Sequence, residues 1–162
     1  MTIRVLGIDP GTAVTGYGVV EPANGRPGRL VECGVIRTNA RDKMWQRLDS
    51  LYDGVTELIQ RHRPDALAVE SIFYGKNART TMVLGQARGV ILLAGAQAGL
   101  EIREFPPAQV KQSIVGAGGA AKRQVGYMVQ QLLRLAAPPM PSDAADGVAV
   151  ALTFLIRQRR YR

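Results

Sequence analysis

Four acidic residues stand where an apolar run ends or where a helix is expected to begin: Asp9, Glu70, Asp143 and Asp146. Side chains at the ends of neighbouring strands can converge on one point, and clustered carboxylates repel one another unless a cation lies among them. Ligand sets made only of oxygen favour hard divalent ions such as magnesium and manganese. These residues are therefore candidate ligands of a metal centre, and such a centre can hydrolyse phosphodiesters.

The charge balance indicates what kind of partner the chain binds. It has 21 lysines and arginines against 13 acidic residues, a formal net charge of +8 and a pI near 10.2. A basic excess favours polyanions, either nucleic acid or an anionic membrane surface. No apolar stretch is long enough to span a membrane, and the first residues lack the apolar core of a secretory signal. We therefore expect nucleic acid as the partner, and no membrane.

The reactive side chains that are scarce exclude several kinds of site. The single cysteine, Cys33, excludes an intramolecular disulfide and a multi-cysteine zinc site, and we expect it to be a small buried hydrophobe. The single histidine, His62, ends a helical pattern, where it can complement the helix dipole. The chain lacks the parts of a Ser-His-Asp triad or a histidine-rich zinc centre. A reducing, cytoplasmic location is expected.

The pattern of apolar residues and turn residues predicts one domain over residues 1–162, with a basic tail in its last few residues. The predicted strands are residues 3–9, 15–21, 29–37, 66–70 and 102–105. The predicted helices are residues 42–62, 78–98, 108–115, 121–135 and 142–160. An antiparallel meander followed by alternating helices and strands predicts an α/β fold, with a five-stranded mixed sheet flanked by helices on both faces.

This topology would bring the acidic residues together. A right-handed crossover places strand 66–70 parallel to and beside strand 3–9, so that Asp9 and Glu70 emerge at the same edge. Asp143 and Asp146 are three residues apart and share one side of the last helix, in its first turn. Simpler roles exist for some of them. Asp143 could complement the helix dipole and Asp9 could form an Asx turn, whereas Glu70 closes an apolar strand with no adjacent cation.

Over residues 3–156 the chain resembles the RuvC-type Holliday-junction resolvases. The shared segments are Gly7-Ile8-Asp9-Pro10-Gly11-Thr12, Thr15-Gly16-Tyr17-Gly18, Glu70-Ser71-Ile72-Phe73, Lys76-Asn77, Leu84-Gly85-Gln86-Ala87-Arg88-Gly89, Gln109-Val110-Lys111-Gln112, Lys122-Arg123-Gln124-Val125 and Asp143-Ala144-Ala145-Asp146. They occur in the family's order and spacing. The glycine-rich opening alone also resembles the phosphate loop of actin-like ATPases, so the specificity lies in the whole set.

The resemblance implies a ribonuclease H-like fold, a homodimer and an endonuclease that depends on magnesium or manganese. The implied reaction is the resolution of four-way DNA junctions in recombination and repair, by paired symmetric nicks that leave 5′-phosphate ends. The implied partners are junction DNA and a branch-migration motor. Asp9, Glu70, Asp143 and Asp146 match the family's catalytic positions. Some members have histidine at the position of Asp143, which leaves open whether this residue ligates a metal directly. As a hypothesis, two ions bind per site, with Asp9 bridging them.

The resemblance also marks candidate DNA-binding residues: Phe73, Lys76, Asn77, Arg79, Arg88, Lys111 and Lys122. Lys111 and Lys122 match basic positions near the scissile phosphate, although each alone could be a solvated lysine. Phe73 matches a residue that enters the junction and stacks on bases, although it could instead cap the core of the sheet. Arg79 and Arg88 would extend the basic surface.

The segment from Val83 to Ala98 is apolar on most sides and rich in small residues. Such a helix is either buried in the core or packed closely against a partner. A two-fold dimer would present two active sites to a pseudo-symmetric four-way substrate, which favours the second alternative.

Three other functions compete with junction resolution. The first is a ribonuclease H-like nuclease that acts on RNA, which the complete set of motifs disfavours. The second is an actin-like ATPase, a class that usually needs two such domains and a second phosphate loop, and this chain lacks both. The third is a catalytically silent junction-binding module, which the four intact carboxylates disfavour.

Overall fold

The strands and helices follow one another in the predicted order. The computed structural model describes residues 3–11, 13–72, 75 and 77–159. Its elements are β1 (Val5–Asp9), β2 (Val14–Ala23), β3 (Arg26–Arg37), α1 (Met44–His62), β4 (Ala66–Glu70), α2 (Ala78–Gln97), β5 (Glu101–Phe105), α3 (Pro107–Val115), α4 (Lys122–Leu133) and α5 (Ser142–Arg159). Every predicted element is present. The largest shift in a boundary is at β3, which begins at Arg26 instead of residue 29.

The strands form one mixed sheet in the order β3-β2-β1-β4-β5. β1, β2 and β3 pair antiparallel, and a tight turn at Asn24 and Gly25 joins the last two; Gly25 has a φ of 69°, as an Asn-Gly hairpin turn requires. β4 pairs parallel with β1, and Ile8 lies opposite Val69. The predicted crossover is therefore confirmed, and the next residue of each strand is a carboxylate.

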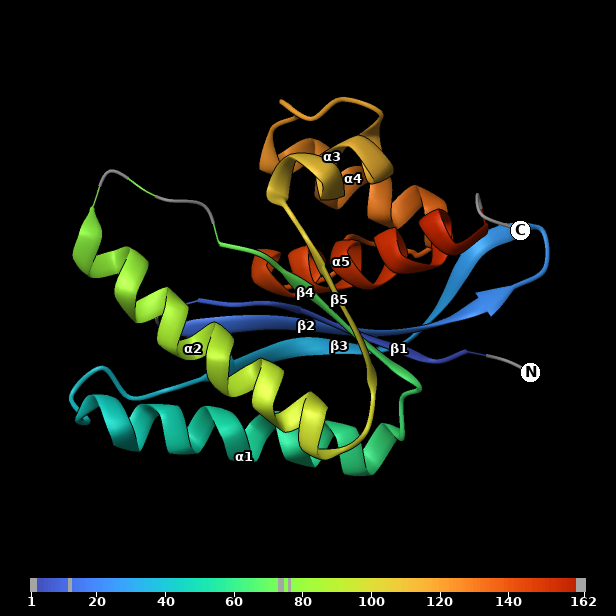
Figure 1. The fold of residues 1–162 in the computed structure, drawn as a ribbon. Helices are drawn as coiled ribbons and strands as arrows, with labels where there is room; N and C mark the ends of the chain where they lie inside the picture. Colours follow the sequence, from blue (N-terminus) through green and yellow to red (C-terminus); the bar gives the residue numbers. More distant parts are fainter. Residues whose placement is uncertain (1–2, 12, 73–74, 76, 160–162) are drawn as a thin grey trace.

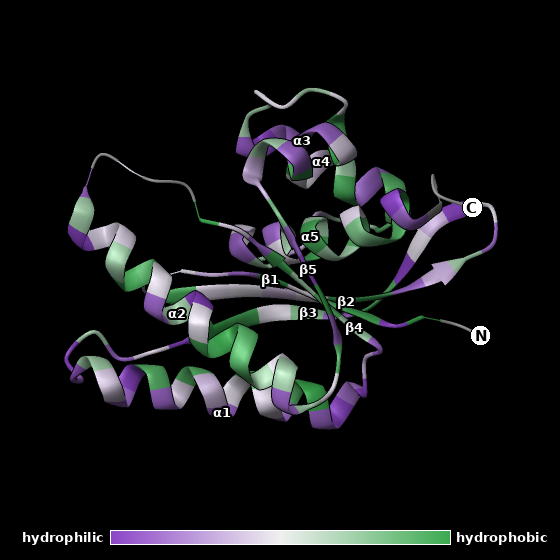
Figure 2. Ribbon diagram, in the orientation of Figure 1, coloured by the Kyte–Doolittle hydropathy of each residue, from purple (hydrophilic) through white to green (hydrophobic). Residues whose placement is uncertain are grey.

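Two layers of helices cover the sheet (Figure 1). One core lies between the sheet and α1 and α2, and the other between the sheet and α3, α4 and α5. Alternation along each strand divides its side chains between the cores: Leu6 and Ile8 face the first, while Val5 faces the second. Figure 2 shows hydrophobic residues concentrated on the strands between these layers. The predicted mixed sheet with helices on both faces is confirmed.

Glycines let α5 pack unusually close to β1 and β2. A Cβ atom on Gly16 of β2 would lie 1.8 Å from the carbonyl oxygen of Asp143, and one on Gly147 of α5 would lie 2.4 Å from Cα of Tyr17. A side chain at either position would force the helix and the strands apart. Because these two residues have no side chains, the first turn of α5 can lie directly against β1 and β2, next to Asp9.

Cys33 and His62 have structural surroundings. His62 is buried in the last turn of α1, with Nε2 2.9 Å from Oε2 of Glu32. The same carboxylate accepts hydrogen bonds from the hydroxyl of Tyr17 and from Arg61. Cys33 packs against the core as expected of a small hydrophobe, but it is only half-buried, whereas a buried residue was expected. Within the described part of the chain, no helix is long and apolar enough to cross a membrane.

Candidate active site

Three of the four predicted catalytic residues line one pocket. Asp9 ends β1, Glu70 ends β4 and Asp146 lies one turn into α5, and together they line a pocket of about 190 Å³. Figure 1 shows why they meet: the carboxyl ends of β1 and β4 and the first turn of α5 lie on the same side of the molecule. Lys111 of α3 and Lys122 of α4 line the pocket too, so that both lysines predicted to contact the scissile phosphate lie beside the carboxylates.

Asp143 lies beside this pocket. It is in the first turn of α5, and its Oδ1 is 3.4 Å from Nζ of Lys122. Its charge raises the pKa of Asp9 and of Asp146, which places it within electrostatic reach of both. The position is also suited to complementing the helix dipole, so both roles considered for Asp143 from the sequence are compatible with the structure.

Burial and mutual repulsion disfavour the ionised form of the carboxylates in the pocket. Burial, followed by the charges of Glu70 and Asp146, raises the pKa of Asp9 to about 8. Burial and the charge of Asp146 raise the pKa of Glu70 to about 7, against opposing effects that include a hydrogen bond with Asp9. Burial also raises the pKa of Asp146. Clustered acids that share a proton in this way favour any cation that can replace it.

Lys122 supplies one such cation from within the chain. Its Nζ is 2.9 Å from Oδ2 of Asp146 and 3.4 Å from Oδ1 of Asp143, and the hydrogen bond with Asp146 raises its pKa. Lys122 therefore partly neutralises the two acids of α5, Asp143 and Asp146. No three acidic, histidine or cysteine side chains among the described residues are arranged, as they stand, to hold one ion.

The donor set nevertheless fits a hard divalent ion. Its members are carboxylates, which are the ligands that magnesium and manganese prefer, and they are held on the ends of secondary-structure elements. The side chain of Lys122 is 56% exposed and has room to move. If it moved away from Asp146, the third carboxylate of the pocket would be free to join the pair formed by Asp9 and Glu70.

The other predicted DNA-binding residues have mixed surroundings. Arg88 forms an ion pair with Glu104 of β5, at 2.5 Å between Nη2 and Oε2. The side chain of Asn77 caps α2 by accepting a hydrogen bond from the backbone nitrogen of Thr80. Arg79 is exposed in the first turn of α2. Phe73 and Lys76 lie outside the described residues. A role in DNA binding therefore stays a prediction for all five.

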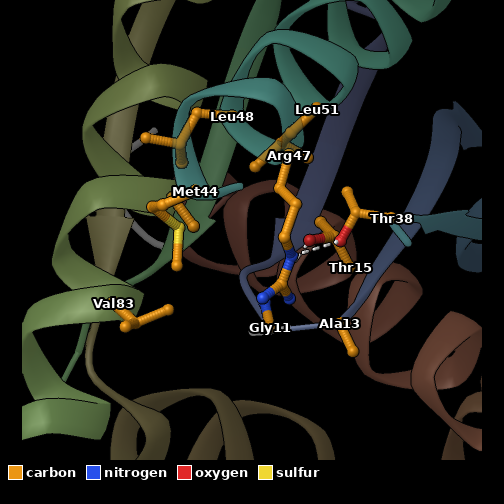
Figure 3. A pocket seen from close by; sticks show the side chains of 10 residues that line it. Gly11, Ala13, Thr15, Thr38, Met44, Arg47, Leu48, Leu51 and Val83 are labelled. Carbon is orange, nitrogen blue, oxygen red and sulfur yellow. Dashed lines mark hydrogen bonds between the residues drawn. The ribbon is translucent and has the colours of Figure 1, made fainter. Parts of the chain in front are cut away.

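A small second pocket lies next to Gly11, two residues after Asp9. It measures about 10 Å³, room for one water at most, and its lining includes Gly11, Thr38 and Arg47. Figure 3 shows the side chain of Arg47 extending from α1 towards Gly11 and Thr38, and its Nε donates a hydrogen bond to Oγ1 of Thr38 at 3.2 Å. Arg47 thus ties the start of α1 to Thr38, the residue after β3. The backbone nitrogen of Thr38 in turn donates a hydrogen bond to the carbonyl oxygen of Ala13, in the segment that joins β1 to β2.

The sequence analysis missed the residues that position the acids, namely Arg47, Gly16 and Gly147. A signal existed for the glycines. Gly16 and Gly18 are two apart on a predicted strand and therefore face the same side, where their missing side chains admit a close neighbour. No such signal marks Arg47.

Comparisons with known proteins identify the family of the chain. The family model of "Crossover junction endodeoxyribonuclease RuvC" matches residues 5–154. A crossover junction endodeoxyribonuclease RuvC from Pelotomaculum thermopropionicum is 53% identical over 148 residues, which cover 91% of this chain and 90% of the relative. The solved Thermus thermophilus RuvC structure is 36% identical, with a TM-score of 0.88 over 99% of this chain and 97% of that one. A second T. thermophilus RuvC structure, in complex with Holliday junction substrate, is 33% identical with a TM-score of 0.88 over 99% and 96%.

The chain belongs to the family of RuvC crossover junction endodeoxyribonucleases. The predicted ribonuclease H-like fold class is therefore confirmed, and the expectation of an endonuclease that acts on DNA holds.

Proposed function

We propose that this protein is a metal-dependent resolvase that cuts four-way DNA junctions by paired, symmetric nicks in recombination and repair. The observation that carries the proposal is the pocket in which Asp9, Glu70 and Asp146 meet between two lysines. Family membership supports the same reaction, since a T. thermophilus relative has been solved with a Holliday junction. Residues 1–162 would form a single nuclease domain, in which one sheet carries a core on each face.

Each residue of the pocket has a role in this reaction. Magnesium or manganese, at two ions per site, would supply an activated water and neutralise charge at phosphorus. Burial, together with the charges of Glu70 and Asp146, raises the pKa of Asp9, so Asp9 lies within electrostatic reach of both acids and would be suited to hold metal with either of them. Glu70 and Asp146 would complete one ligand set each, with Asp143 orienting water at the rim. No protein nucleophile is needed, and the products keep a 5′ phosphate.

Lys111 and Lys122 would bind the DNA. Lys111 already lowers the pKa of Glu70 and Asp146 by its charge, and Lys122 pairs with Asp143 and Asp146. Once cations neutralise these acids, the ammonium group of Lys122 would lose its partners in the pocket. It would then be available to the phosphate beside the cut.

The exposed face of α2 supports a homodimer. Met82 and Leu93 are 68% and 51% exposed on this helix. Between them, a Cβ atom added to Gly85 or Gly89 would meet no atom within 4 Å. An apolar face with no side chains at its centre permits two helices to approach closely about a two-fold axis. Two chains paired in this way would supply the two sites that paired nicks need. Contact with a branch-migration motor, and action in the cytoplasm, are proposed from the family resemblance.

The test is cleavage of a synthetic immobile junction, with and without magnesium, resolved on a sequencing gel. We expect symmetric nicks with 5′-phosphate ends only when magnesium or manganese is present. Asp9→Asn should bind the junction normally and cut it at least about 10³-fold more slowly, because the carboxylate shared by both ligand sets is lost. Duplex DNA and structured RNA are the substrate controls. Equal cutting of RNA would overturn the proposal in favour of an RNA-directed nuclease, and normal nicking by Asp9→Asn would remove Asp9 from the mechanism.

A further inference from the structure

A second hollow adjoins the carboxylate pocket. It measures about 510 Å³ and lies between α4 and the segment that leads into α5; its lining includes Lys122, Arg123 and Tyr127 on one side and Pro138, Pro139 and Met140 on the other. We call it the α4 groove. Its volume falls within the range of about 300–1,000 Å³ that is typical of ligand sites.

The α4 groove exposes large apolar side chains. Tyr127 is 58% exposed and Met140 is 76% exposed, although residues of these types are usually more buried. Large apolar side chains that gather in a hollow indicate a binding surface, unlike apolar residues scattered singly over a protein. Neither residue belongs to the family motifs that carry the resemblance, and the cleavage reaction proposed above does not use them.

The groove is continuous with the catalytic pocket. Lys122 lines both hollows. Adjacent residues of the same two helices also divide between them: Val125 and Asp146 line the pocket, whereas Gly126 and Ala145 line the groove. A polymer held in the pocket could therefore continue into this groove.

The charges of the groove select the chemistry of its occupant. Lys122 and Arg123 bring positive charge to its wall, and no acidic residue is among the described residues that line it. An aromatic ring and an apolar floor beside basic groups form the combination that binds single nucleic-acid strands, in which bases stack on rings while cations contact phosphates. A protein partner could bind the apolar part of the groove. It would not explain why the groove shares Lys122 with the catalytic pocket.

We propose that the α4 groove binds the DNA strand immediately beside the scissile phosphate, with Tyr127 stacking on a base or sugar and Arg123 contacting a phosphate. The proposal rests on the proposed junction-cutting function. It adds a site that holds the cut strand in register with the carboxylates. Tyr127 and Arg123 are positioning residues here, because they hold the strand and take no part in the chemistry.

The test places one 2-aminopurine in a synthetic junction and moves it one nucleotide at a time across both sides of the cut site. The wild-type protein is added without divalent ions, so that it binds but does not cut. Stacking on Tyr127 should quench the fluorescence at one or two positions on one side of the cut. Tyr127→Phe keeps the ring and should keep the quenching, whereas Tyr127→Ala should lose it and weaken junction binding about fivefold or more.

A matched pair of arginines tests the phosphate contact. Arg123→Gln should weaken binding and reduce the dependence of binding on salt by about one phosphate contact. Arg134→Gln changes the same charge at the opposite end of α4 and should leave that dependence unchanged.

The outcomes separate this proposal from the proposed function. If the wild-type protein neither binds nor cuts junctions, the proposed function fails. If it binds and cuts while Tyr127→Ala shows the same quenching and affinity, the α4 groove does not hold the strand. A change in sedimentation of Tyr127→Ala without DNA, at unchanged junction affinity, would instead assign the groove to a contact between copies of the chain.

Discussion

Helices α2 and α5 have similar compositions and opposite surroundings. Both are rich in alanine and aliphatic residues, and α2 has three glycines where α5 has one. In α5 the residues from Val148 to Leu155 are buried, and a Cβ atom on Gly147 would collide with the backbone of Tyr17. In α2 only Ala87, Ile91, Ala94 and Gly95 are buried, and a Cβ atom on Gly85 or Gly89 would meet nothing. Small residues thus bring α5 close to the sheet within one chain, whereas those of α2 leave an open face, on which we propose that a second chain packs.

The largest effect should come from a charge on the exposed face of α2. Leu93→Glu would bury a carboxylate in the proposed dimer interface, which costs several kcal/mol. We expect the dimer to dissociate at concentrations at least about 100-fold above those at which the wild type dissociates, by analytical ultracentrifugation. Paired cutting of one junction should give way to single nicks, because each chain carries one site.

The matched control for Leu93→Glu is Trp45→Glu, which puts the same charge on an exposed large side chain of α1. It should leave the sedimentation of the protein unchanged. If Leu93→Glu sediments like the wild type, the α2 face is not the dimer interface. The small residues of α2 would then have no role in contact with a second chain.

A smaller effect should separate the glycines of the two helices. Gly147→Ala inserts a methyl group where no space exists and should lower the free energy of unfolding by about 1–3 kcal/mol. Because the substitution would also shift the first turn of α5, cutting should fall even at temperatures where the protein is folded. Gly85→Ala adds the same methyl group on an open helix face. It should leave the monomer unchanged or stabilise it by up to about 1 kcal/mol.

Urea denaturation of both glycine variants, at a protein concentration low enough to keep the chains monomeric, measures this contrast in stability. Cutting assays of Gly147→Ala at a common fraction folded measure its effect on activity. Equal loss of stability in the two variants would contradict this prediction. It would mean that the space around each glycine does not determine how much an added methyl group destabilises the protein.

The sequence predicted which strands are neighbours in the sheet, because strand periodicity and connection rules determine this. Strand periodicity and the crossover rule predicted that β1 and β4 are neighbours, and the register then places Asp9 beside Glu70. The pairing of Lys122 with Asp146 was not predictable, because it depends on how α4 packs on α5 across a connection with no periodic signal. The α4 groove was missed for the same reason. Patterns along the chain indicate which face of a helix or strand is apolar. They do not indicate how closely two helices pack when an irregular connection joins them, as it joins α4 and α5.

The smallest expected effect concerns the carboxylates of Asp9 and Glu70, at the ends of β1 and β4 where α5 meets the sheet. The pKa of Asp9, at about 8, and that of Glu70, at about 7, lie above the values of about 3.9 and 4.3 expected in the unfolded chain. Between these limits the folded protein binds more protons than the unfolded one, so its free energy of unfolding should fall as the pH rises from about 4 to about 8. This loss applies to the protein without divalent ions.

Asp9→Asn should remove much of that dependence, because asparagine resembles the protonated acid and adds no charge to the cluster. We expect the variant to be more stable than the wild type at pH 8 by on the order of 1–2 kcal/mol, and nearly equal to it at pH 4. Asp49→Asn, which removes an exposed carboxylate of α1, controls for the change in net charge and should leave the dependence on pH intact. Magnesium should stabilise the wild type at pH 8 more than it stabilises Asp9→Asn. If both proteins lose stability equally between pH 5 and pH 8, the acids do not repel one another in the folded protein. The packing of α5 would then bring Asp146 to the sheet at no electrostatic cost, and a bound cation would have no repulsion to relieve.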